Sequence, residues 1–580
     1  MKYYFTNQRN IQIVLSLLKA NGIKRIVTSP GATDIPINFS LQHDSFFELY
    51  SCVDERSAAY MACGMAEETK EPVALTCTGA TSSRNYMPGL TEAFYRHLPV
   101  LAITCSQPSS RIGHYFNQVT DRNHVPNDIV EESVCAQIVK DEDDEWDVTI
   151  KVNRAILGLK RNGGGPCHIN LEIGGNSNYF CKEIVPARKI DRITSIDTFP
   201  NIPQGRIAIF VGQHPVWDEV LKNAVESFCE KHNAFVLCDQ TSNYKGRYAV
   251  LYPLIIDQAE EMHKFNEPDL NLIIHIGFVS NITAKAKQVW RVNEDGEIRD
   301  TFKRLTKVFQ MSEKEFFLYY VNKDSFSVQT SLYEEYEQKY QSLLSKIPEL
   351  PFSNLWMAQH ISANLPENSV LHLGIRNSLR SYEYFKIPDS VAVFSNTGGF
   401  GIDGGMSSLI GASIASPNKL FFGVFGDLLF FYDINSLGNR DIKNNVRILL
   451  VNNGLGQEFK NYSCLSASFG EETDSFIAAK GHFGCQSRQL VKGYTETLGF
   501  EYMSASNKEE FKAVINRFLS SEHSEKPMVL EVFTNTDEEN EALKRVTMIT
   551  TKSKLMKTAK DVINMPEMQK VKTFLKGKTK

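Results

Sequence analysis

The sequence predicts an α/β protein of three doubly wound parallel-sheet domains, in which the first and third domains are a divergent duplication of one unit. Two observations support this prediction. Residues 55–106 align without a gap on residues 402–453, at a constant offset of 347. In both segments the expected strands are continuous runs of Val, Ile, Leu and Phe, which is typical of parallel strands buried on both faces.

The elements of the two copies follow the same order. In the first copy, a helix rich in small residues at 56–66 precedes apolar strands at 72–76 and 100–104. The matching helix and strands of the second copy are expected at 405–415, 420–425 and 447–451. Equivalent positions carry different chemistry, because a carboxylate, Glu55, opens the first copy, whereas Gly426-Asp427 and Asn452-Asn453 lie in the second. Copies that have divided their chemistry in this way predict a site built where the two meet.

The first domain is expected over residues 1–185. An amphipathic helix around Ile11 to Leu18 leads into a strand at 25–28, and a polar stretch at 190–204 then predicts a linker. At the other end of the chain, residues 551–580 contain nine lysines against two acidic residues. This basic C-terminal tail is expected to be solvated or to dock on an acidic surface.

Two further α/β domains follow the linker. Strands at 205–212, 234–237 and 272–276 predict a central domain over 195–340. Strands at 369–373 and 391–394 open the third domain, which is expected over 350–540 and contains the second copy.

Composition and charge argue against several classes of function. With 580 residues and a net charge of −5, the chain lacks the basic footprint of a nucleic-acid-binding protein. Eleven cysteines without a C-x-x-C pair argue against a zinc ribbon or a disulfide framework. The N-terminus lacks the pattern of a signal peptide, and the most apolar window, 420–432, is too short to span a bilayer. We therefore expect a cytoplasmic enzyme without a membrane span.

The segment 426–453 carries most of the predicted chemistry. Asp427 follows one buried strand and Asn453 ends the next, so both belong to the carboxyl edge of a parallel sheet, where ligands bind. With the backbone carbonyl of Leu455 they form a set of hard oxygen ligands suited to Mg²⁺, which keeps other positions for water and phosphate. Glycines and hydroxyls near helix starts could donate N–H groups to a bound diphosphate, at Ser378, Gly404 and Ser407. Alone, Gly426-Asp427 is also typical of a tight turn.

A glycine-rich segment offers a competing interpretation. Gly399 to Gly404 matches G-x-G-x-x-G after the strand at 391–394, and Asp427 lies 23 residues later. Dinucleotide-binding folds place a ribose-binding acid at such a spacing. A dinucleotide-dependent oxidoreductase is therefore the rival class, although it leaves Asn453 and Glu55 without a role.

These residues resemble a known family. Glu55 in Val-Asp-Glu-Arg-Ser, Asp427 with the Asn452-Asn453 pair, and the three-domain order are similar to the thiamine diphosphate-dependent 2-oxo acid decarboxylases and carboligases, over about residues 10–540. Within that superfamily the chain most resembles the menaquinone-pathway 2-succinyl-5-enolpyruvyl-6-hydroxy-3-cyclohexene-1-carboxylate synthases. The stretches that carry this similarity are Ser29-Pro30-Gly31, Asp54 to Ala59, Asn117-Gln118, Gly401 to Gly404 and Gly456 to Phe459.

The resemblance implies thiamine diphosphate and Mg²⁺ as cofactors, with a pyrimidine-binding first domain and a diphosphate-binding third domain. Glu55 would hydrogen-bond the aminopyrimidine ring and so promote removal of the thiazolium C2 proton. Ile402 would be the apolar wedge under the bent cofactor, Gly426 and Phe459 would lie beside it, and Gln118 would belong to the substrate-side loop. Sites between the first domain of one subunit and the third domain of another imply a homodimer or homotetramer.

Three positions depart from the synthase pattern. That family would have arginines, which bind carboxylates bidentately, where this chain has Thr33, Tyr382 and Thr397. Loss of several such contacts, each worth about 1.5 to 3 kcal/mol, predicts that a dianionic donor and acceptor no longer bind usefully. Lys285 could remain from a basic pair of that family, although Ala286 follows it. The polar candidates near the cleft are His114, Asn117, Gln118, Arg376, Arg380 and Tyr382. The two arginines could equally be surface or salt-bridged residues, and His114 could be a structural hydrogen-bonding residue.

We therefore expect an enzyme that uses Mg²⁺ and thiamine diphosphate to decarboxylate a small 2-oxo acid and to transfer the acyl carbanion to an acceptor. Simple decarboxylation to an aldehyde is a second mechanism. The dinucleotide oxidoreductase is a second class of function, and a non-catalytic paralogue that only binds ligand is a third. Glu55 argues against the paralogue, since an idle site has no chemical need for it.

Overall fold

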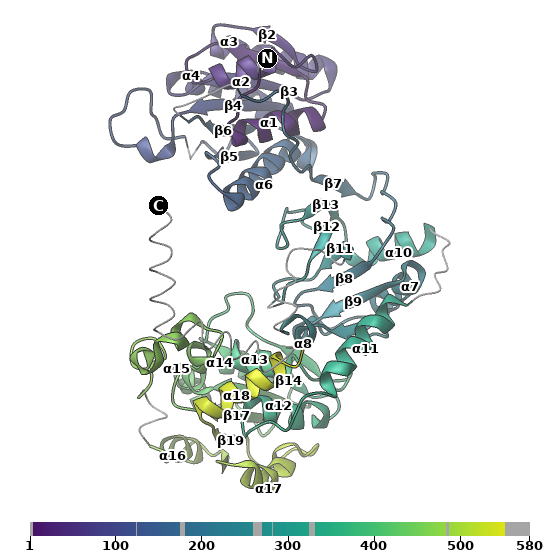
Figure 1. Cartoon of the computed structure of the whole chain (residues 1–580), viewed down its shortest axis with the longest axis vertical. Helices are drawn as coiled ribbons and strands as arrows, with labels where there is room; N and C mark the ends of the chain where they lie inside the picture. The colour runs from purple at the N-terminus through teal and green to yellow at the C-terminus, as the bar shows by residue number, and fades with distance from the viewer. Residues whose placement is uncertain are drawn as a thin grey trace, which may run out of the picture. The chain divides into compact units, whose positions relative to one another are not determined.

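The computed structural model describes residues 4–122, 125–174, 180–258, 270–280, 282–323, 331–482 and 487–550. The predicted basic tail at 551–580 lies outside these described residues. The chain divides into two compact units, residues 1–201 with 288–311 and residues 202–287 with 312–580. Each unit is described by itself below, with the element labels of Figure 1.

The first unit contains a six-stranded parallel sheet in the order β2-β1-β3-β4-β6-β5. Its strands are β1 (Arg25–Ser29), β2 (Glu48–Ser51), β3 (Val73–Thr78), β4 (Val100–Ser106), β5 (Glu132–Ala136) and β6 (Cys167–Glu172). Its helices are α1 (Arg9–Ala20), α2 (Ile35–Leu41), α3 (Glu55–Thr69), α4 (Thr81–Asn85), α5 (Met87–Tyr95) and α6 (Glu142–Gly158).

Both faces of this sheet are covered. Ile26 of β1 packs in one cluster with residues of α1, α2 and α6, and its neighbour Val27 packs in a second cluster with residues of α3 and α5. Leu101 and Ala102 of β4 alternate between the same two clusters. Alternate side chains of a strand point to opposite faces, so a continuous apolar run is what a sheet with two covered faces requires.

The third sheet repeats the strand order of the first. Its strands are β14 (Val370–Leu373), β15 (Ala392–Phe394), β16 (Phe421–Gly426), β17 (Val446–Asn452), β18 (Glu501–Ala505) and β19 (Met528–Phe533). They pair in parallel in the order β15-β14-β16-β17-β19-β18, which matches the first sheet strand for strand. The predicted duplication is confirmed.

Helices of the third domain connect these strands. They are α12 (Asn354–Ile361), α13 (Asn377–Tyr382), α14 (Gly405–Ala415), α15 (Asp427–Tyr432), α16 (Leu490–Thr497), α17 (Lys508–Phe518) and α18 (Thr536–Thr547). Short 3₁₀ turns of the chain are η1 (Ser109–Arg111), η2 (Arg161–Gly163), η3 (Gln240–Ser242), η4 (Ser362–Asn364), η5 (Ile434–Gly438), η6 (Gln457–Lys460) and η7 (Leu465–Thr473). Met406, Leu409 and Ile410 of α14 pack with Phe421 and Phe425 of β16 in the core on one face of the sheet.

The middle sheet has seven strands in the order β10-β9-β8-β11-β12-β13-β7. They are β7 (Asp191–Thr194), β8 (Ile207–Val211), β9 (Ala234–Cys238), β10 (Ala249–Leu251), β11 (Leu270–Ile276), β12 (Ala286–Val292) and β13 (Leu305–Gln310). The accompanying helices are α7 (Glu219–His232), α8 (Pro253–Ile256), α10 (Glu313–Lys323) and α11 (Leu332–Leu344).

Strand β7 lies within the stretch that was expected to be only a linker. It pairs in parallel with β13, and Lys307 Nζ of β13 contacts the Asp191 carboxylate at 2.9 Å. Its polar side chains form no strand pattern along the chain because β7 is an edge strand whose charges pair across the ladder.

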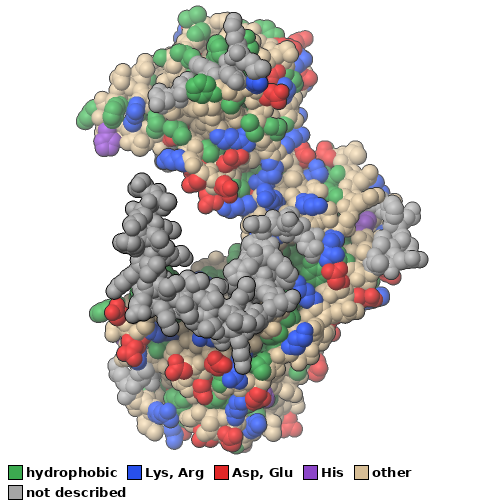
Figure 2. Space-filling view, viewed as in Figure 1, with side chains coloured by type: hydrophobic (Ala, Val, Ile, Leu, Met, Phe, Trp, Pro, Cys, Tyr) green, Lys and Arg blue, Asp and Glu red, His purple; other side chains and the backbone are tan. Residues whose placement is uncertain are grey.

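The mixed charges on the surface and the length and polarity of the helices are consistent with the composition. Lysine and arginine side chains are interspersed with aspartate and glutamate on the face that Figure 2 shows. Within the ranges that the structure describes, no helix is both long enough and apolar enough to cross a membrane.

Candidate active site

The third sheet has a topological switch point at its carboxyl edge. Chain order reverses between β14 and β16, and ligands of open parallel sheets bind in the crevice that such a reversal creates. Strand β14 leads through Arg376 into α13, which contains Ser378, and β16 leads directly into α15 at Asp427. The predicted diphosphate and metal residues therefore lie on one edge. The glycine-rich segment 399–404 follows β15, the edge strand beside β14.

Asp427 is the most constrained carboxylate of this edge. Its side chain is buried and accepts hydrogen bonds from the backbone N–H groups of Leu428 at 2.7 Å, Asn453 at 3.2 Å and Gly454 at 2.5 Å. Burial raises the pKa of Asp427 to about 6, against the lowering effect of these donors. The carboxylate therefore ties the loop after β17 to the start of α15.

The residues of this loop fit a magnesium ion. Strand β17 ends at Asn452, so Asn453 begins the loop instead of ending the strand, and Asn452 is a buried donor to Glu531 at 2.7 Å. Among the described residues, the donors to Asp427 are backbone N–H groups, so its charge has no side-chain cation as a partner. A buried carboxylate, the Asn453 amide oxygen and the Leu455 carbonyl are the hard oxygen donors that Mg²⁺ prefers.

The predicted cofactor-binding residues surround the same edge. Gly404 has φ +77° and is the N-cap of α14, a conformation that glycine adopts without strain. Ile402 and Phe459 are exposed large hydrophobic residues, 38% and 41% exposed. Gly426 is the N-cap of α15, and Ser378 is buried, with its Oγ 3.5 Å from Asn354 Nδ2.

Ser407 is already engaged within the fold. Both its N–H group and its hydroxyl donate to the Asp433 carboxylate, each at 2.7 Å. Sequence reasoning missed Asp433, because no local pattern relates it to a serine 26 residues earlier.

Arg380 is a structural ion pair rather than a free cation. Its guanidinium binds Glu458 of η6 with two hydrogen bonds, at 2.8 and 3.0 Å. Burial favours the neutral form of both groups, but their attraction outweighs it, raising the pKa of Arg380 and lowering that of Glu458. Arg376 is half exposed, and its Nη1 lies 3.8 Å from Glu458. Glu458 thus fastens η6 to α13.

Two positions where the family would have arginines are internal. Thr397 is buried and donates to Gln213 Oε1 at 2.8 Å. Tyr382 is fully buried, and within the described residues its hydroxyl has no hydrogen-bond partner, so burial raises its pKa well above the usual value. Lys285 is exposed just before β12.

Glu55 occupies the first turn of α3 in the first unit. Asp54 caps this helix by accepting from the Ser57 N–H group at 3.2 Å, so the carboxylate of Glu55 is left at the helix start. The Glu55 carboxylate is partly buried and lies 3.5 Å from the Asn85 side-chain amide.

The switch point of the first sheet, between β1 and β3, is occupied by Thr33. Its hydroxyl donates to the Cys105 carbonyl at 2.6 Å and contacts the Thr78 hydroxyl. A Cβ at Gly31 would lie 2.5 Å from Thr78 Cβ, so only glycine allows this approach. The loop after β1 is therefore packed onto the ends of β3 and β4.

The substrate-side loop residues are exposed. His114, Asn117 and Gln118 follow η1, and Gln118 adopts φ +59°. The Asn117 carbonyl accepts from the Gln107 amide at 2.9 Å. The exposure leaves the Gln118 side chain available to a ligand.

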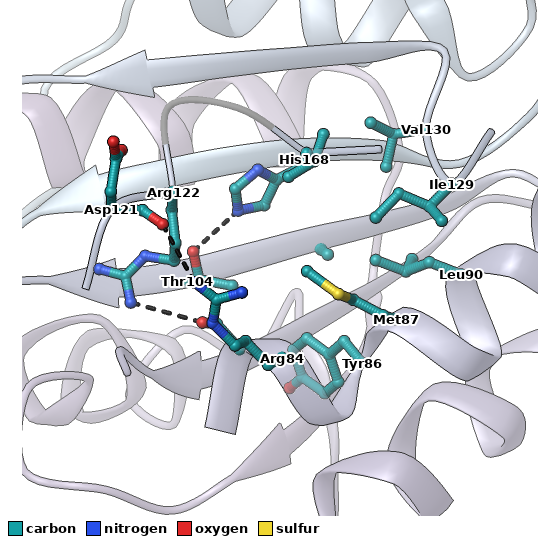
Figure 3. Close-up of a pocket in the computed structure, with 13 residues that line it drawn as sticks. Arg84, Tyr86, Met87, Leu90, Thr104, Asp121, Arg122, Ile129, Val130 and His168 are labelled. Atoms are coloured by element: carbon teal, nitrogen blue, oxygen red, sulfur yellow. Dashed lines mark hydrogen bonds between the residues drawn. The ribbon is translucent and has the colours of Figure 1, made fainter. Parts of the chain in front are cut away.

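A pocket in the first unit lies between β4, β6, α4 and α5 (Figure 3). His168 faces it and is bound by Thr104 at 2.8 Å and Ser133 at 2.9 Å, and burial lowers its pKa to about 4. Arg122 is buried and donates to Asn170 at 3.2 Å and Ser83 at 3.4 Å. These groups hold the segment after the substrate-side loop against the sheet, and no local sequence pattern points to them.

Comparison with known proteins identifies the family of the chain. The family model "Thiamine pyrophosphate enzyme, N-terminal TPP binding domain" matches residues 10–125. The 2-succinyl-5-enolpyruvyl-6-hydroxy-3-cyclohexene-1-carboxylate synthase of Bacteroides thetaiotaomicron is 30% identical over 573 residues, covering 93% of this chain and 98% of the relative. The synthase of Phocaeicola vulgatus is 31% identical over 565 residues, with the same coverage. The synthase of Porphyromonas gingivalis is 25% identical over 574 residues, covering 93% and 97%.

Among solved structures, the thiamine diphosphate-dependent 4-hydroxybenzoylformate decarboxylase of Rhodococcus jostii RHA1 is 16% identical, covers 91% of this chain and 100% of its own, and has a TM-score of 0.39. That distant likeness carries no argument. The family assignment rests on the match to the curated relatives, which extends over nearly the full length of both chains. The chain therefore belongs to the 2-succinyl-5-enolpyruvyl-6-hydroxy-3-cyclohexene-1-carboxylate synthase family and is a thiamine diphosphate-dependent transferase or decarboxylase.

Proposed function

We propose that this enzyme uses Mg²⁺ with thiamine diphosphate to decarboxylate a small 2-oxo acid and to join the acyl carbanion to an acceptor. The observation that carries the proposal is the buried Asp427 carboxylate, whose donors are backbone N–H groups of its own edge. A buried negative charge without a cationic partner is costly, and a bound cation removes that cost. The names of the relatives, which are synthases, support the joining step.

The predicted cofactor-binding residues would have separate roles. Asp427, Asn453 and Leu455 would hold the metal, and N–H groups near Ser378 and Gly404 would bind the diphosphate. When bound, thiamine diphosphate supplies a carbon nucleophile and an electron sink for the carbanion left by CO₂. Glu55 would hold a proton shared with the pyrimidine ring, and Ile402 would support the cofactor from below.

The two sets of residues belong to different units of the chain, Glu55 to the first and Asp427 to the second. We infer a homodimer or homotetramer in which the first domain of one subunit completes the third domain of another. Gln118, exposed on its loop, would then face the substrate. Cytoplasmic location fits this metabolic role.

The substrate is proposed to differ from that of the synthases. Thr33, Tyr382 and Thr397 replace arginines of the family pattern, and the hydroxyls of Thr33 and Thr397 already donate inside the fold. A second substrate carboxylate at these positions would be desolvated without a partner, at a cost of about 3 to 5 kcal/mol. The pocket should therefore prefer a monocarboxylate 2-oxo acid such as pyruvate, with a polar acceptor such as a sugar carbonyl.

A donor panel tests this proposal. The enzyme, loaded with Mg²⁺ and thiamine diphosphate, is incubated with individual 2-oxo acids, and CO₂ release is measured. We expect release from a monocarboxylate donor and no more than trace product from 2-oxoglutarate with isochorismate. Efficient turnover of that pair would contradict the altered pocket, and no release from any 2-oxo acid would contradict the function itself.

A further inference from the structure

Arg376 occupies a sharp, strained turn between β14 and α13. Its backbone has φ +66° and ψ −116°, a region that L-residues rarely adopt and that glycine tolerates. Strained strand-to-helix turns of this kind present the side chain of the turn residue at the carboxyl edge of a sheet. The guanidinium is accordingly exposed, with 53% of the side chain accessible.

The first sheet contains a similar backbone conformation at a different place. Ala80, which follows β3, has φ +59° and ψ −128° and is the N-cap of α4. Because β3 corresponds to β16, Ala80 is the counterpart of Asp427 and not of Arg376, which follows the counterpart of β1. At Ala80 this conformation carries a methyl group, whereas at Arg376 it carries a long cationic side chain. A bulky residue that keeps such a conformation indicates that its side chain is used.

The charges around Arg376 leave it available to a ligand. The Glu458 carboxylate is already bound by Arg380 with two short hydrogen bonds, and Arg376 reaches it only at 3.8 Å. The Arg376 guanidinium also lies over the ring of Phe400, whose centroid is 5.0 Å away. Arg380, and not Arg376, is therefore the main partner of the Glu458 carboxylate.

Arg376 lies on the same edge of the third sheet as the predicted metal ligands. Asp427 binds the backbone of Asn453 and Gly454 at one end of the loop after β17, and Glu458 binds Arg380 at the other end. Arg376 therefore lies on the switch-point edge that also carries Asp427. A guanidinium there can pair bidentately with a planar carboxylate.

Decarboxylation decides which carboxylate this is. The carboxylate that leaves as CO₂ loses its charge in the transition state, so a guanidinium bound to it would stabilise the ground state and slow the reaction. An oxyanion that keeps its charge throughout carries no such penalty. A monocarboxylate donor loses its only carboxylate as CO₂, so the surviving carboxylate belongs to the acceptor. We propose that Arg376 binds a carboxylate of the acceptor, an inference that rests on the proposed function and names the specificity residue of its site.

The test compares R376G, R376Q and R376K with the wild-type holoenzyme on matched pairs of substrates. The acceptor pair, used with the best donor of the panel, is glyoxylate and glycolaldehyde, which differ in the carboxylate. The donor pair, 2-oxoglutarate and 2-oxopentanoate, is the control, and no enzyme of the set is expected to prefer its second carboxylate. For the acceptor pair, we expect R376G and R376Q to lower the kcat/KM preference for the carboxylate about 100-fold, mainly through KM, and R376K to recover part of it.

Two controls separate binding from folding. Glycine relieves the strain, so the R376G unfolding midpoint is expected at or above the wild-type value. Thiamine diphosphate affinity, measured by calorimetry, should stay within a factor of about three of wild type, because Arg376 is assigned to substrate. R517Q is the matched variant, since Arg517 is an exposed arginine paired at 2.8 Å with Glu501, at the start of β18 and thus at the opposite edge of the same sheet.

A lowered preference for glyoxylate in R376G and R376Q supports the inference. A wild-type preference for 2-oxoglutarate that these variants lose would assign the carboxylate to the donor, and would overturn both the inference and the monocarboxylate donor. An unchanged preference in the acceptor pair would overturn the inference while leaving the proposed function intact. So would a lower unfolding midpoint for R376G, which would make Arg376 a structural residue. If the wild-type enzyme releases no CO₂ from any 2-oxo acid, the proposed function fails first.

Discussion

The carboxyl edges of the first and third sheets have the same strand topology, but different side chains lie at their switch points. In the first sheet the switch point is filled by the protein itself, through Thr33 and its hydrogen bond to Cys105. In the third sheet the same point is bordered by the strained turn of Arg376 and the buried carboxylate of Asp427. Duplication therefore supplied two equivalent switch points, of which Thr33 occupies one and Arg376 and Asp427 border the other. Topology sets where a site can form, and side chains decide whether it does.

Of the variants that test this comparison of the two copies, a substitution of Glu55 is expected to have the largest effect. Glu55→Gln should keep most cofactor affinity, because the residue belongs to the first copy and not to the diphosphate anchor. Exchange of the thiazolium C2 proton, followed by NMR, should slow by about 10² to 10⁴. Exchange at the wild-type rate would show that Glu55 is only a structural residue at the start of a helix.

Asp427 should show the reverse pattern. Asp427→Asn keeps an oxygen acceptor for the loop N–H groups but removes the charge, so calorimetry should find Mg²⁺-dependent cofactor binding weakened by about 100-fold. Asp441→Asn, at an exposed aspartate of the same domain, is the control. Undiminished binding by the Asp427 variant, or binding that needs no metal, would remove the proposed site.

A third prediction concerns buried histidines, one in each copy. His168 of the first sheet and His372 of the third have pKa values lowered by burial from 6.5 to about 4. Below pH 6.5 the unfolded chain takes up a proton that the folded chain refuses, so stability is lost as pH falls from 6.5 towards 4. Between pH 7 and pH 5 each histidine should cost about 2 kcal/mol of unfolding free energy.

His168→Gln should flatten that pH dependence by this amount in urea titrations, and His372→Gln should do the same for the third sheet. Their hydrogen bonds differ, since His168 is bound by Thr104 and Ser133, whereas Nε2 of His372 has no partner among the described residues. The His168 variant should therefore lose more stability at pH 7. A profile parallel to wild type would mean that the histidine is charged in the fold.

The smallest effect is expected at the two threonines. Thr397→Val removes the hydrogen bond to Gln213, and Thr33→Val removes the hydrogen bonds of its hydroxyl with Cys105, Thr78 and the Gly79 N–H group. Each change should lower the unfolding free energy by about 1 to 2 kcal/mol. Thr33→Ser should restore most of the loss. If Thr33→Val instead leaves stability unchanged and raises the donor KM, the hydroxyl contacts substrate and the first switch point is not closed.

The sequence predicted the fold well because its signals were local and repeated. The unbroken apolar runs predicted strands within about two residues of β3, β4, β16 and β17, and the constant offset revealed the duplication. Edge strand β7 was missed because its charges pair across the sheet with Lys307 rather than repeating along the chain. Short polar strands at an edge carry no apolar pattern for sequence reasoning to detect.

The candidate site was less predictable where partners are distant in sequence. Asp427 and Asn453 could be paired because both follow buried strands of one sheet. The engagement of Arg380 by Glu458, 78 residues away, and of Thr397 by Gln213, 184 residues away, depends on tertiary packing. The sequence left Arg380 as a possible substrate residue, whereas in the structure its ion pair with Glu458 holds η6 in place.

The identical strand order of the first and third sheets also bears on how the chain folds. Two copies with one pairing scheme in a single chain invite exchange of equivalent strands, a known failure of repeat proteins. At the offset of 347, Phe421, Phe422 and Phe425 of β16 correspond to Ala74, Leu75 and Thr78 of β3. Inserting the aromatic strand into the first sheet would overfill a core built for small side chains. Divergence in side-chain volume thus keeps each strand in its own sheet while both sheets retain one topology.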